Sequence, residues 1–574
     1  MKKNLPLVCL ALAVALLSPT FAAEPSDQTA LDMKAASNFD TTGFVFDVAN
    51  GPFEPNGDSL GKNYKCPEWF RDAKFGIYMH WGLGSVAGFN GHYGRYMYFQ
   101  NEPEAYRQDI QTARKPSLSG YRPGQESAYN YHVKTFGHPS KFGYKDFIPM
   151  WKADKFDPAA LVALYKESGA KYVGVMAVHH DNFDLYDSTY QPWNSVRMGP
   201  KIDVVGEWKK ACAKENLRFA ITSHLSNQTH EHLFYQGMAD STGPLKDVPY
   251  DTMDPKNEGL YGKRTPDHLR RLNPDFAQSW YHRTKELIDK YNPDLIYLDG
   301  GLPNGDYGLN LAAHYYNHNI QVNGKQDGVF AIKRLSPPGF TLDVESAGID
   351  KPMKEPWQVD TTINPGWFYL GKDASSPTAA AADAGMSSTE NSKYGADRIR
   401  LPAGKVIQNL ADIVSKNGNM LLNVGLRPDG SLPDTFRHEL LEIGGWLKAN
   451  GEAIYGTRPF KVFGEGPFQM PTSKNKFNDN EYNFTAQDIR FTTKGNNVYA
   501  IFLGWPGNGA PATIISLGSK EVGTIKSVTM LATGEPVKWN QDEAGLHITM
   551  PGKTVGDHAY VLKITLGSPG GLRP

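Results

Sequence analysis

The chain has 574 residues, which exceeds what one hydrophobic core usually supports, so at least two folded units are expected. Hydrophobic residues make up 40% and charged residues 21% of the sequence, as in ordinary globular proteins. A formal net charge of -1 gives no electrostatic attraction to nucleic acid or to an anionic membrane, which argues against both as partners.

Residues 1–23 have the pattern of a secretory signal peptide. Two lysines precede a short apolar run, which ends in small residues at Ala22 or Ala23. The run is shorter than the ~20 residues that a spanning helix needs, and no later stretch qualifies, so no membrane span is expected. We therefore predict an exported protein, periplasmic or secreted. Residues 24–60 are rich in small and polar side chains and are expected to form a mobile or lightly packed leader.

From about residue 61, short apolar runs alternate with helical patterns. Runs that are apolar on both faces are typical of strands in a buried parallel sheet. They occur at 75–82, 171–181, 217–225, 294–301, 328–334 and 419–425. One helix is expected to have Asp157 as its N-cap and Pro158 in its first position, and a later one to stop at Asn292. This alternation predicts a parallel α/β domain over residues 61–458.

The alternation itself is equally consistent with a doubly wound open sheet. A (β/α)8-like barrel is favoured because residues able to carry chemistry follow several different strands, and barrel enzymes assemble their sites at the carboxyl ends of strands. These residues are His80, His179, His180, His224 and Asp299.

Beyond about residue 459 the helical pattern disappears. Short alternating segments such as IKSVTML and AYVLKITLG are separated by Gly, Asn and Pro. This pattern predicts an antiparallel β-sandwich over residues 459–574. The expected fold is therefore a barrel catalytic domain followed by a C-terminal sandwich.

Two carboxylates are candidate catalytic groups. Asp299 ends the run IYLD and precedes two glycines, which permit close approach of backbone or ligand. The alternative is that Asp299 caps the next helix or pairs with an arginine. Glu345 is expected in a loop after the following strand, where it can reach back over the site, and the alternative for it is solvated surface.

The doublet of His179 and His180 suggests a metal cluster at first sight. Consecutive side chains on a strand point to opposite faces, however, so hydrogen bonding to hydroxyl groups is the favoured interpretation and no metal site is predicted. His80, in the motif HWG, is a single histidine at one strand end, and a lone histidine is by itself more often a satisfied structural residue. The absence of GxSxG, P-loop, GxGxxG and HExxH motifs argues against esterases, nucleoside triphosphatases, dinucleotide-binding enzymes and zinc proteases.

Five blocks of sequence occur in order between about residues 65 and 460. They are KFGIYMHWG, KYVGVMAVHHDNFDLYDSTYQPWNSVRMGPKIDVVGEW, YNPDLIYLDGG, NLADIVSKNGNMLLNVGLRPDGSLPD and GEAIYGTRPF. Together they resemble the α-L-fucosidases of glycoside hydrolase family 29, and the HHDxF and NxLLNVGxxxDG blocks are highly specific. The resemblance implies an exo-acting, retaining α-L-fucosidase that removes terminal fucosyl residues from an oligosaccharide or polysaccharide through a covalent intermediate. Another retaining exo-glycosidase, such as an α-L-galactosidase, and a non-catalytic glycan-binding protein on the same scaffold remain alternatives.

The same resemblance implies roles for individual residues. Asp299 would be the nucleophile. The histidines of the HWG and HHD motifs, His80, His179 and His180, would form hydrogen bonds with fucose hydroxyl groups. The mechanism requires neither a metal nor another cofactor. His224 and Tyr93 are substrate-binding candidates whose surrounding segments depart from the family's pattern. Arg334 is a further candidate, and Trp367, near the site by order, is expected either to stack on the methyl-bearing face of fucose or to belong to the core.

The general acid/base is the position at which this chain departs most from the family. Many members have a Trp-Glu element, whereas here Trp357 is followed by Gln358, which cannot exchange protons. Members with a Glu soon after an Arg-bearing strand match Arg334 and Glu345. Glu345 is therefore predicted as the acid/base, with Glu355 in reserve.

Overall fold

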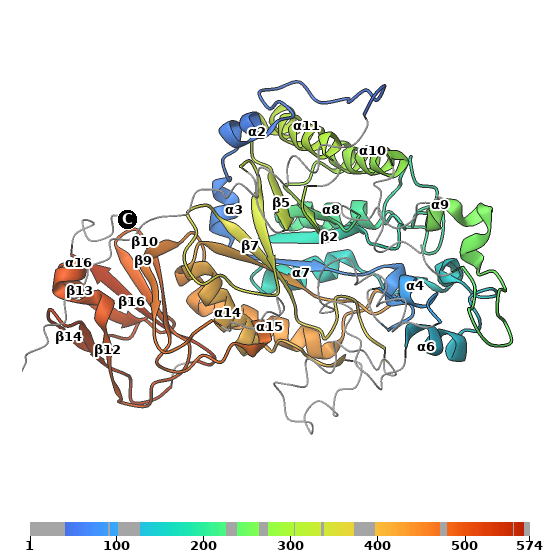
Figure 1. The fold of residues 1–574 in the computed structure, drawn as a ribbon. Helices are drawn as coiled ribbons and strands as arrows, with labels where there is room; N and C mark the ends of the chain where they lie inside the picture. The colour runs from blue at the N-terminus through green and yellow to red at the C-terminus, as the bar shows by residue number, and fades with distance from the viewer. Residues whose placement is uncertain are drawn as a thin grey trace, which may run out of the picture.

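The larger unit of the computed structural model is a closed barrel of eight parallel strands, joined in chain order from β1 to β8 (Figure 1). The structure describes residues 41–89, 92–100, 127–225, 238–262, 274–302, 305–333, 338–371, 397–470, 479–554 and 556–567. The barrel strands are β1 (Phe75–Met79), β2 (Tyr172–Val178), β3 (Arg218–Ser223), β4 (Leu295–Leu298), β5 (Val329–Lys333), β6 (Thr341–Glu345), β7 (Trp357–Thr362) and β8 (Gly418–Asn423). Closure comes from β1 pairing with both β2 and β8, so the predicted barrel is confirmed and the open sheet is excluded.

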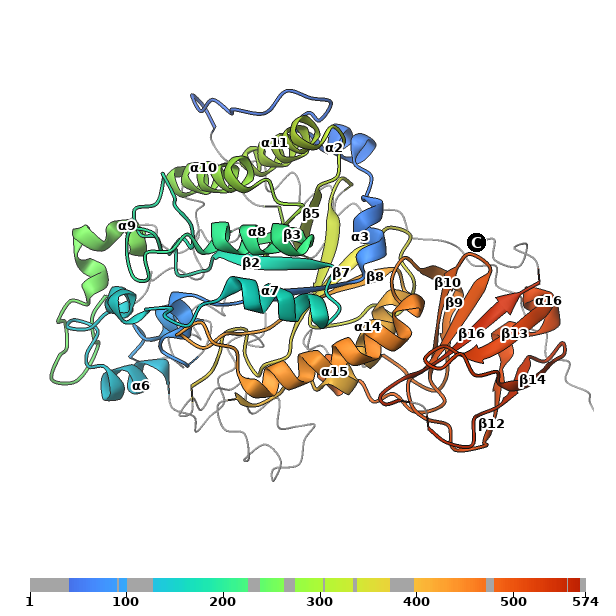
Figure 2. The same cartoon turned by 180° about the vertical axis from the view of Figure 1, so that it is seen from behind.

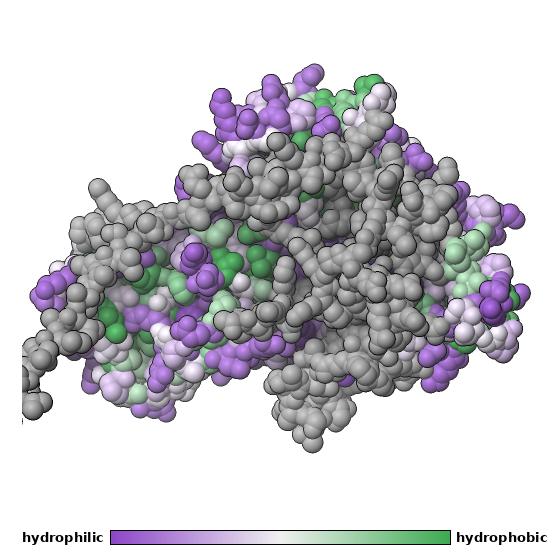
Figure 3. All heavy atoms as spheres, viewed as in Figure 1, coloured by the Kyte–Doolittle hydropathy of each residue, from purple (hydrophilic) through white to green (hydrophobic). Residues whose placement is uncertain are grey.

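Helices surround the barrel, as the sequence pattern predicts. They are α2 (Gly57–Asn63), α3 (Glu68–Ala73), α4 (Tyr93–Tyr96), α6 (Ala128–Thr135), α7 (Pro158–Glu167), α8 (Val204–Glu215), α9 (Glu258–Tyr261), α10 (Pro274–Tyr291), α11 (Asp306–Asn323), α14 (Ala403–Ser415) and α15 (Asp434–Asn450). The expected N-cap of α7 is present, because the Asp157 side chain accepts a hydrogen bond from the Ala160 amide at 3.0 Å. Helix α10 ends one residue before Asn292, as predicted. Hydrophilic residues gather on the outer surface over α2 and α11 (Figure 3).

The strands β6 and β7 are the two that the hydrophobic pattern did not reveal. Their sequences, TLDVE and WQVDTT, alternate apolar and polar residues, although every residue of β7 is buried. The polar members face a barrel interior in which Gln358 donates a hydrogen bond to Asp343 at 2.8 Å. Glu345 is consequently the last residue of a strand, so its expected position in a loop is wrong.

The described part of the expected leader is packed against the barrel. Phe44 and Phe46 contact Tyr281 of α10 edge-on, with ring centroids 5.7 and 5.4 Å away. The Phe53 amide donates a hydrogen bond to Asn317 of α11 at 3.0 Å. Residues 41–60 therefore contact the shell around the barrel while most of their side chains stay exposed or half-buried, and the predicted signal peptide at 1–23 lies outside the described residues.

A second unit follows α15 and consists of two antiparallel sheets (Figure 2). One contains β9 (Arg458–Glu465), β10 (Ile489–Lys494), β11 (Asn497–Phe502), β13 (Ile525–Met530) and β16 (Tyr560–Leu566), and the other β12 (Pro511–Ile514), β14 (Lys538–Gln541) and β15 (Leu546–Thr549); the short α16 (Ser519–Val522) lies between β12 and β13. The sheets share one apolar core, which confirms the sandwich. A buried ion pair of 2.6 Å joins Arg490 to Asp412 of α14 and so connects this unit to the barrel. Among the described residues, no helix combines the length and apolarity needed to span a bilayer.

Candidate active site

Three charged side chains meet at the carboxyl ends of β4, β5 and β6. Lys333, the last residue of β5, places its ammonium nitrogen 2.5 Å from Asp299 Oδ1 and 2.7 Å from Glu345 Oε2. The three strands are neighbours in the barrel, so their ends lie side by side. The side chains of Asp299 and Glu345 keep 19% and 25% of their exposure, so a substrate entering the barrel mouth can reach both.

The spacing of the two carboxylates indicates the stereochemistry that the site can support. Because both oxygens bind one nitrogen, the sum of the two contact distances is an upper limit on the separation of those oxygens. That limit is too short for the roughly 6.5 to 9.5 Å of inverting glycosidases, and it agrees with the roughly 5 to 5.5 Å of retaining ones. The arrangement therefore fits a double-displacement reaction.

The environment separates the pKa values of the two carboxyl groups. Burial alone would raise the pKa of Asp299, but the Lys333 ammonium and the hydrogen bond from His224 outweigh burial and hold this pKa well below its ordinary value. Burial raises the pKa of Glu345 to about 7; Lys333 opposes the shift, and the negative charges of Asp360 and Asp299 add to it. Asp299 is thus ionised and Glu345 can hold a proton near neutral pH, which is the division that a nucleophile and a general acid need.

A buried polar layer supports this pair from inside the barrel. Asp360 accepts hydrogen bonds from Tyr78 at 3.3 Å and Tyr297 at 3.0 Å, and it lies 3.7 Å from the Lys333 ammonium. Burial raises the pKa of Asp343 well above its ordinary value, and the nearby Asp360 carboxyl group raises it further. The layer thus adds the Asp360 carboxyl group to the acidic groups close to the Lys333 ammonium.

Imidazoles form the wall of the site opposite Glu345. His224 Nδ1 lies 3.0 Å and His180 Nε2 3.6 Å from Asp299 Oδ2. The rings of His80 and His179 complete the wall, with centroids 5.5 Å apart. Burial lowers the pKa values of His80, His179 and His180 well below the ordinary range, so these three rings are neutral and each offers one hydrogen-bond donor and one acceptor.

Two further aromatic side chains belong to the site. Trp367, a sequence candidate, lies with its ring centroid 5.2 Å from that of His80 and 5.9 Å from the Lys333 ammonium. His92 stacks on His180 at 5.3 Å, and burial lowers its pKa to about 4. His92 was not among the sequence candidates, although Tyr93, the next residue in the same connection after β1, was.

Two candidates from the sequence, Tyr93 and Glu355, take other positions. The Tyr93 hydroxyl binds His132 Nδ1 at 2.7 Å in the hydrophobic core, so Tyr93 is not free to contact a sugar. Glu355 is exposed and precedes β7, which places it near the amino end of the barrel, away from Asp299. Arg334 lies outside the described residues.

The sequence candidates included Arg334 but missed its neighbour Lys333. It ends the apolar run VFAIK in the same way that Asp299 follows LIYL. A backbone hydrogen bond of 2.7 Å from Lys333 to the Gly300 carbonyl sets the two strand ends together. The rule that a polar residue ending a buried strand faces the site would therefore have found it.

A parallel barrel with an ionised and a protonated carboxyl group at its mouth, backed by neutral imidazoles, defines a retaining glycoside hydrolase. The family model of the alpha-L-fucosidases matches residues 45–452, and that of the alpha-L-fucosidase C-terminal domain matches residues 481–565. The chain belongs to the alpha-L-fucosidase family. It is a glycoside hydrolase that removes fucosyl residues.

Similar proteins support this membership along nearly the whole chain. Rat tissue alpha-L-fucosidase is 27% identical over 89% of this chain and 92% of its own length, and the human tissue enzyme is 26% identical with the same coverage. The crystal structure of a Thermotoga maritima alpha-fucosidase in complex with fucose has a TM-score of 0.62 and 27% identity, and it covers 89% of this chain and 99% of its own. The Thermotoga enzyme has also been solved with a mechanism-based inhibitor.

Proposed function

We propose that Asp299 is the nucleophile and Glu345 the general acid/base of this enzyme. The observation that carries the proposal is a single ammonium group, on Lys333, in contact with one ionised and one protonatable carboxyl group. Both carboxyl groups are in place, as catalysis requires and as glycan binding alone does not.

In the first step, Asp299 attacks the anomeric carbon of an α-L-fucoside while the bond from that carbon to the leaving oxygen breaks. Glu345 donates its proton to the leaving oxygen. The product is a β-linked fucosyl ester of Asp299. In the second step Glu345 removes a proton from water, the resulting hydroxide oxygen attacks the anomeric carbon, and the Asp299 carboxylate leaves. Two inversions restore the α configuration.

We assign recognition of the sugar to the imidazole wall. The neutral rings of His80, His179 and His180 can each donate to one hydroxyl group and accept from another. Trp367 offers an apolar face on which the methyl-bearing side of fucose can stack. His224 is assigned mainly to orienting Asp299, because its Nδ1–H points at that carboxylate.

The natural substrate proposed is a fucosylated oligosaccharide or polysaccharide met outside the cytoplasm. Support for fucose as the recognised sugar comes from the Thermotoga relative, which was crystallised with it. Support for export comes from the signal-like segment at residues 1–23. Amino-terminal sequencing of protein recovered from the medium or periplasm tests export, and a mature chain that retains this segment would contradict it.

Covalent trapping tests the assignment of the nucleophile. A 2-deoxy-2-fluoro-α-L-fucosyl fluoride has a good leaving group, and its fluorine destabilises the oxocarbenium-like transition state, so the ester forms and then persists. Digestion and mass spectrometry are expected to find the label on Asp299. A label on another carboxylate would transfer the role.

The pH dependence of kcat/KM is expected to depend on Lys333. The general acid must be protonated, so kcat/KM should fall as pH rises through the Glu345 pKa of about 7. Since the Lys333 ammonium lowers the pKa values of both Glu345 and Asp299, Lys333→Met should raise both and move both limbs of the profile to higher pH. Lys333→Arg keeps the charge and should shift the limbs less. If Lys333→Met lowers the maximum of kcat/KM without shifting either limb of the pH profile, the lysine does not set the pKa values of these carboxyl groups.

A further inference from the structure

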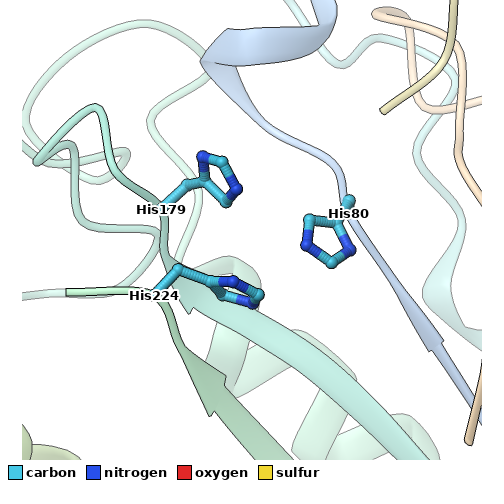
Figure 4. Close-up of side chains that lie close together, drawn as sticks. All are labelled: His80, His179 and His224. Carbon is cyan, nitrogen blue, oxygen red and sulfur yellow. The ribbon is translucent and has the colours of Figure 1, made fainter. Parts of the chain in front are cut away.

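Three imidazoles from three neighbouring strand ends converge in the wall of the active site. His80, His179 and His224 follow β1, β2 and β3, and Figure 4 shows their rings turned toward one another across the barrel mouth. One nitrogen of each ring lies within 4.8 Å of one nitrogen of each of the others. All three side chains are buried. Their nitrogens therefore lie close enough together to bind one small ligand other than a sugar.

The hydrogen bonds of His80 determine which of its nitrogens can act as a ligand. Asn423 donates through Nδ2 to Thr362 Oγ1 at 3.0 Å and to the Trp367 carbonyl at 2.8 Å, so its Oδ1 must face His80. That oxygen lies 3.0 Å from His80 Nδ1, which therefore carries the hydrogen. The lone pair of His80 is left on Nε2. A ring nitrogen that donates to an amide oxygen while the other stays basic is the usual state of a metal-binding histidine.

His224 has the same arrangement with a carboxylate in place of the amide. Its Nδ1 lies 3.0 Å from Asp299 Oδ2, and because the ionised carboxylate can only accept, Nδ1 carries the hydrogen. The lone pair on Nε2 faces the hydroxyl of Thr222 at 3.2 Å, which can rotate its hydrogen elsewhere. Carboxylate–histidine pairs of this kind orient imidazoles in zinc sites.

His179 is the third ring. Its centroid lies 5.0 Å from that of His224 and 5.5 Å from that of His80. Among the described residues none forms a hydrogen bond with its side chain, so its tautomer can follow the ligand. Three imidazoles with one basic nitrogen each match the protein ligands of a tetrahedral zinc site whose fourth position is open.

We propose that His80, His179 and His224 form an inhibitory site for a divalent transition-metal ion such as Zn²⁺, which excludes the sugar. All-nitrogen ligands favour Zn²⁺, Cu²⁺ or Ni²⁺ over Mg²⁺ and Ca²⁺, which prefer oxygen. Nitrogens at about 2.0 to 2.1 Å from one tetrahedral ion lie roughly 3.4 Å apart, and the nitrogens of these three rings already lie within 4.8 Å of one another.

The proposal rests on the assignment of two of these imidazoles, His80 and His179, to sugar binding. If the ion and the sugar use the same lone pairs, the inhibition is competitive: KM rises with the concentration of the ion and kcat does not change. Catalysis itself uses no metal in the proposed mechanism, so EDTA should leave the activity of the metal-free enzyme unchanged and should reverse inhibition by Zn²⁺.

A second cluster on the surface of the barrel provides the control. Asp289 of α10 lies beside His314 and His318 of α11. Here His314 Nδ1 accepts a hydrogen bond from the Ala49 amide at 3.0 Å, so Nε2 carries the hydrogen and donates to Asp289 at 2.8 Å. Both nitrogens of His314 are occupied, and an ion could bind only after one of these hydrogen bonds is lost. This cluster is the weaker metal site.

Calorimetric titration of the full-length, chelator-treated enzyme with zinc sulfate tests the proposal. Wild type is expected to bind one Zn²⁺ in the active site, with an apparent affinity that falls when L-fucose is present. His179→Ala should weaken binding at least about 10-fold, and His318→Ala should leave it unchanged. A second ligand variant, His80→Ala, covers the case in which the first does not fold, and thermal melting of each variant checks the fold.

Three results would overturn the proposal. They are equal Zn²⁺ affinity in wild type and both ligand variants, loss of binding in His318→Ala alone, and binding that is indifferent to fucose. Calorimetry measures binding without turnover. A wrong assignment of the catalytic carboxylates therefore leaves this result readable, and failure of the metal site leaves the assignment of Asp299 and Glu345 untouched.

Discussion

Replacement of Asp299 by glycine is expected to lower kcat by roughly 10⁴-fold or more while leaving the fold intact. The variant cannot form the fucosyl ester, because glycine has no carboxylate to attack the anomeric carbon in the first step. The side chain of Asp299 is partly exposed at the barrel mouth, and removing it leaves the backbone bond from residue 299 to the Ser223 carbonyl in place. Steady-state kinetics on an aryl α-L-fucoside and far-UV circular dichroism measure the two effects.

Added azide gives the Asp299→Gly variant a distinctive product. Azide fits the space left by the carboxylate and attacks the anomeric carbon of an activated α-fucoside directly. One inversion then gives β-fucosyl azide, which NMR identifies. Near wild-type hydrolysis without azide would remove Asp299 from its role, and an α-configured azide from this variant would contradict its position as the first nucleophile.

Replacement of Glu345 by alanine is expected to affect substrates according to the leaving group. Acidic phenols leave without protonation, so fucosylation of the enzyme by their fucosides should lose little. Fucosyl glycans have poor leaving groups and should lose roughly 10²-fold or more, the usual scale of general-acid catalysis. The second step also slows, because the residue that deprotonates water is missing, so the fucosyl ester should accumulate with good substrates. Presteady-state bursts and intact-protein mass spectrometry detect that ester.

Azide distinguishes the two carboxylates by the configuration of the product. In Glu345→Ala it attacks the β-linked ester of Asp299, needs no deprotonation, and gives α-fucosyl azide after two inversions. The matched control is Glu355→Ala, which removes an exposed glutamate near the amino end of the barrel and should keep wild-type rates for every leaving group. Azide rescue in Glu355→Ala but not in Glu345→Ala would transfer the acid/base role to Glu355.

Much of the barrel was predictable from local patterns. Six of its strands are continuous apolar runs, because both faces of each strand are buried, and the cap of α7 follows from an Asp-Pro pair at residues 157 and 158. The polar residues that follow β1, β2, β3 and β4 locate the site, since parallel strands in a barrel all end on the same face. These features depend on residues that are close to one another in the sequence, so the sequence pattern reveals them.

The strands β6 and β7 escaped prediction for a physical reason. Their alternating pattern resembles that of a half-exposed strand, because part of the barrel interior is polar and not apolar. Asp343 and Asp360 are accommodated there by hydrogen bonds from an amide and from tyrosine hydroxyl groups that come from other strands. Nothing in the sequences of β6 and β7 themselves indicates those partners.

Which residues act together was decided by the tertiary structure. The sequence by itself marked Asp299 and the histidines as candidates and, through the family resemblance, Glu345 as the acid. Closure of the barrel then placed Lys333 between Asp299 and Glu345, turned the Tyr93 hydroxyl toward His132 and left Glu355 at the far end. A pKa and a contact both depend on groups that lie close in space but distant in sequence, so the division of labour between the two carboxyl groups exists only in the folded chain.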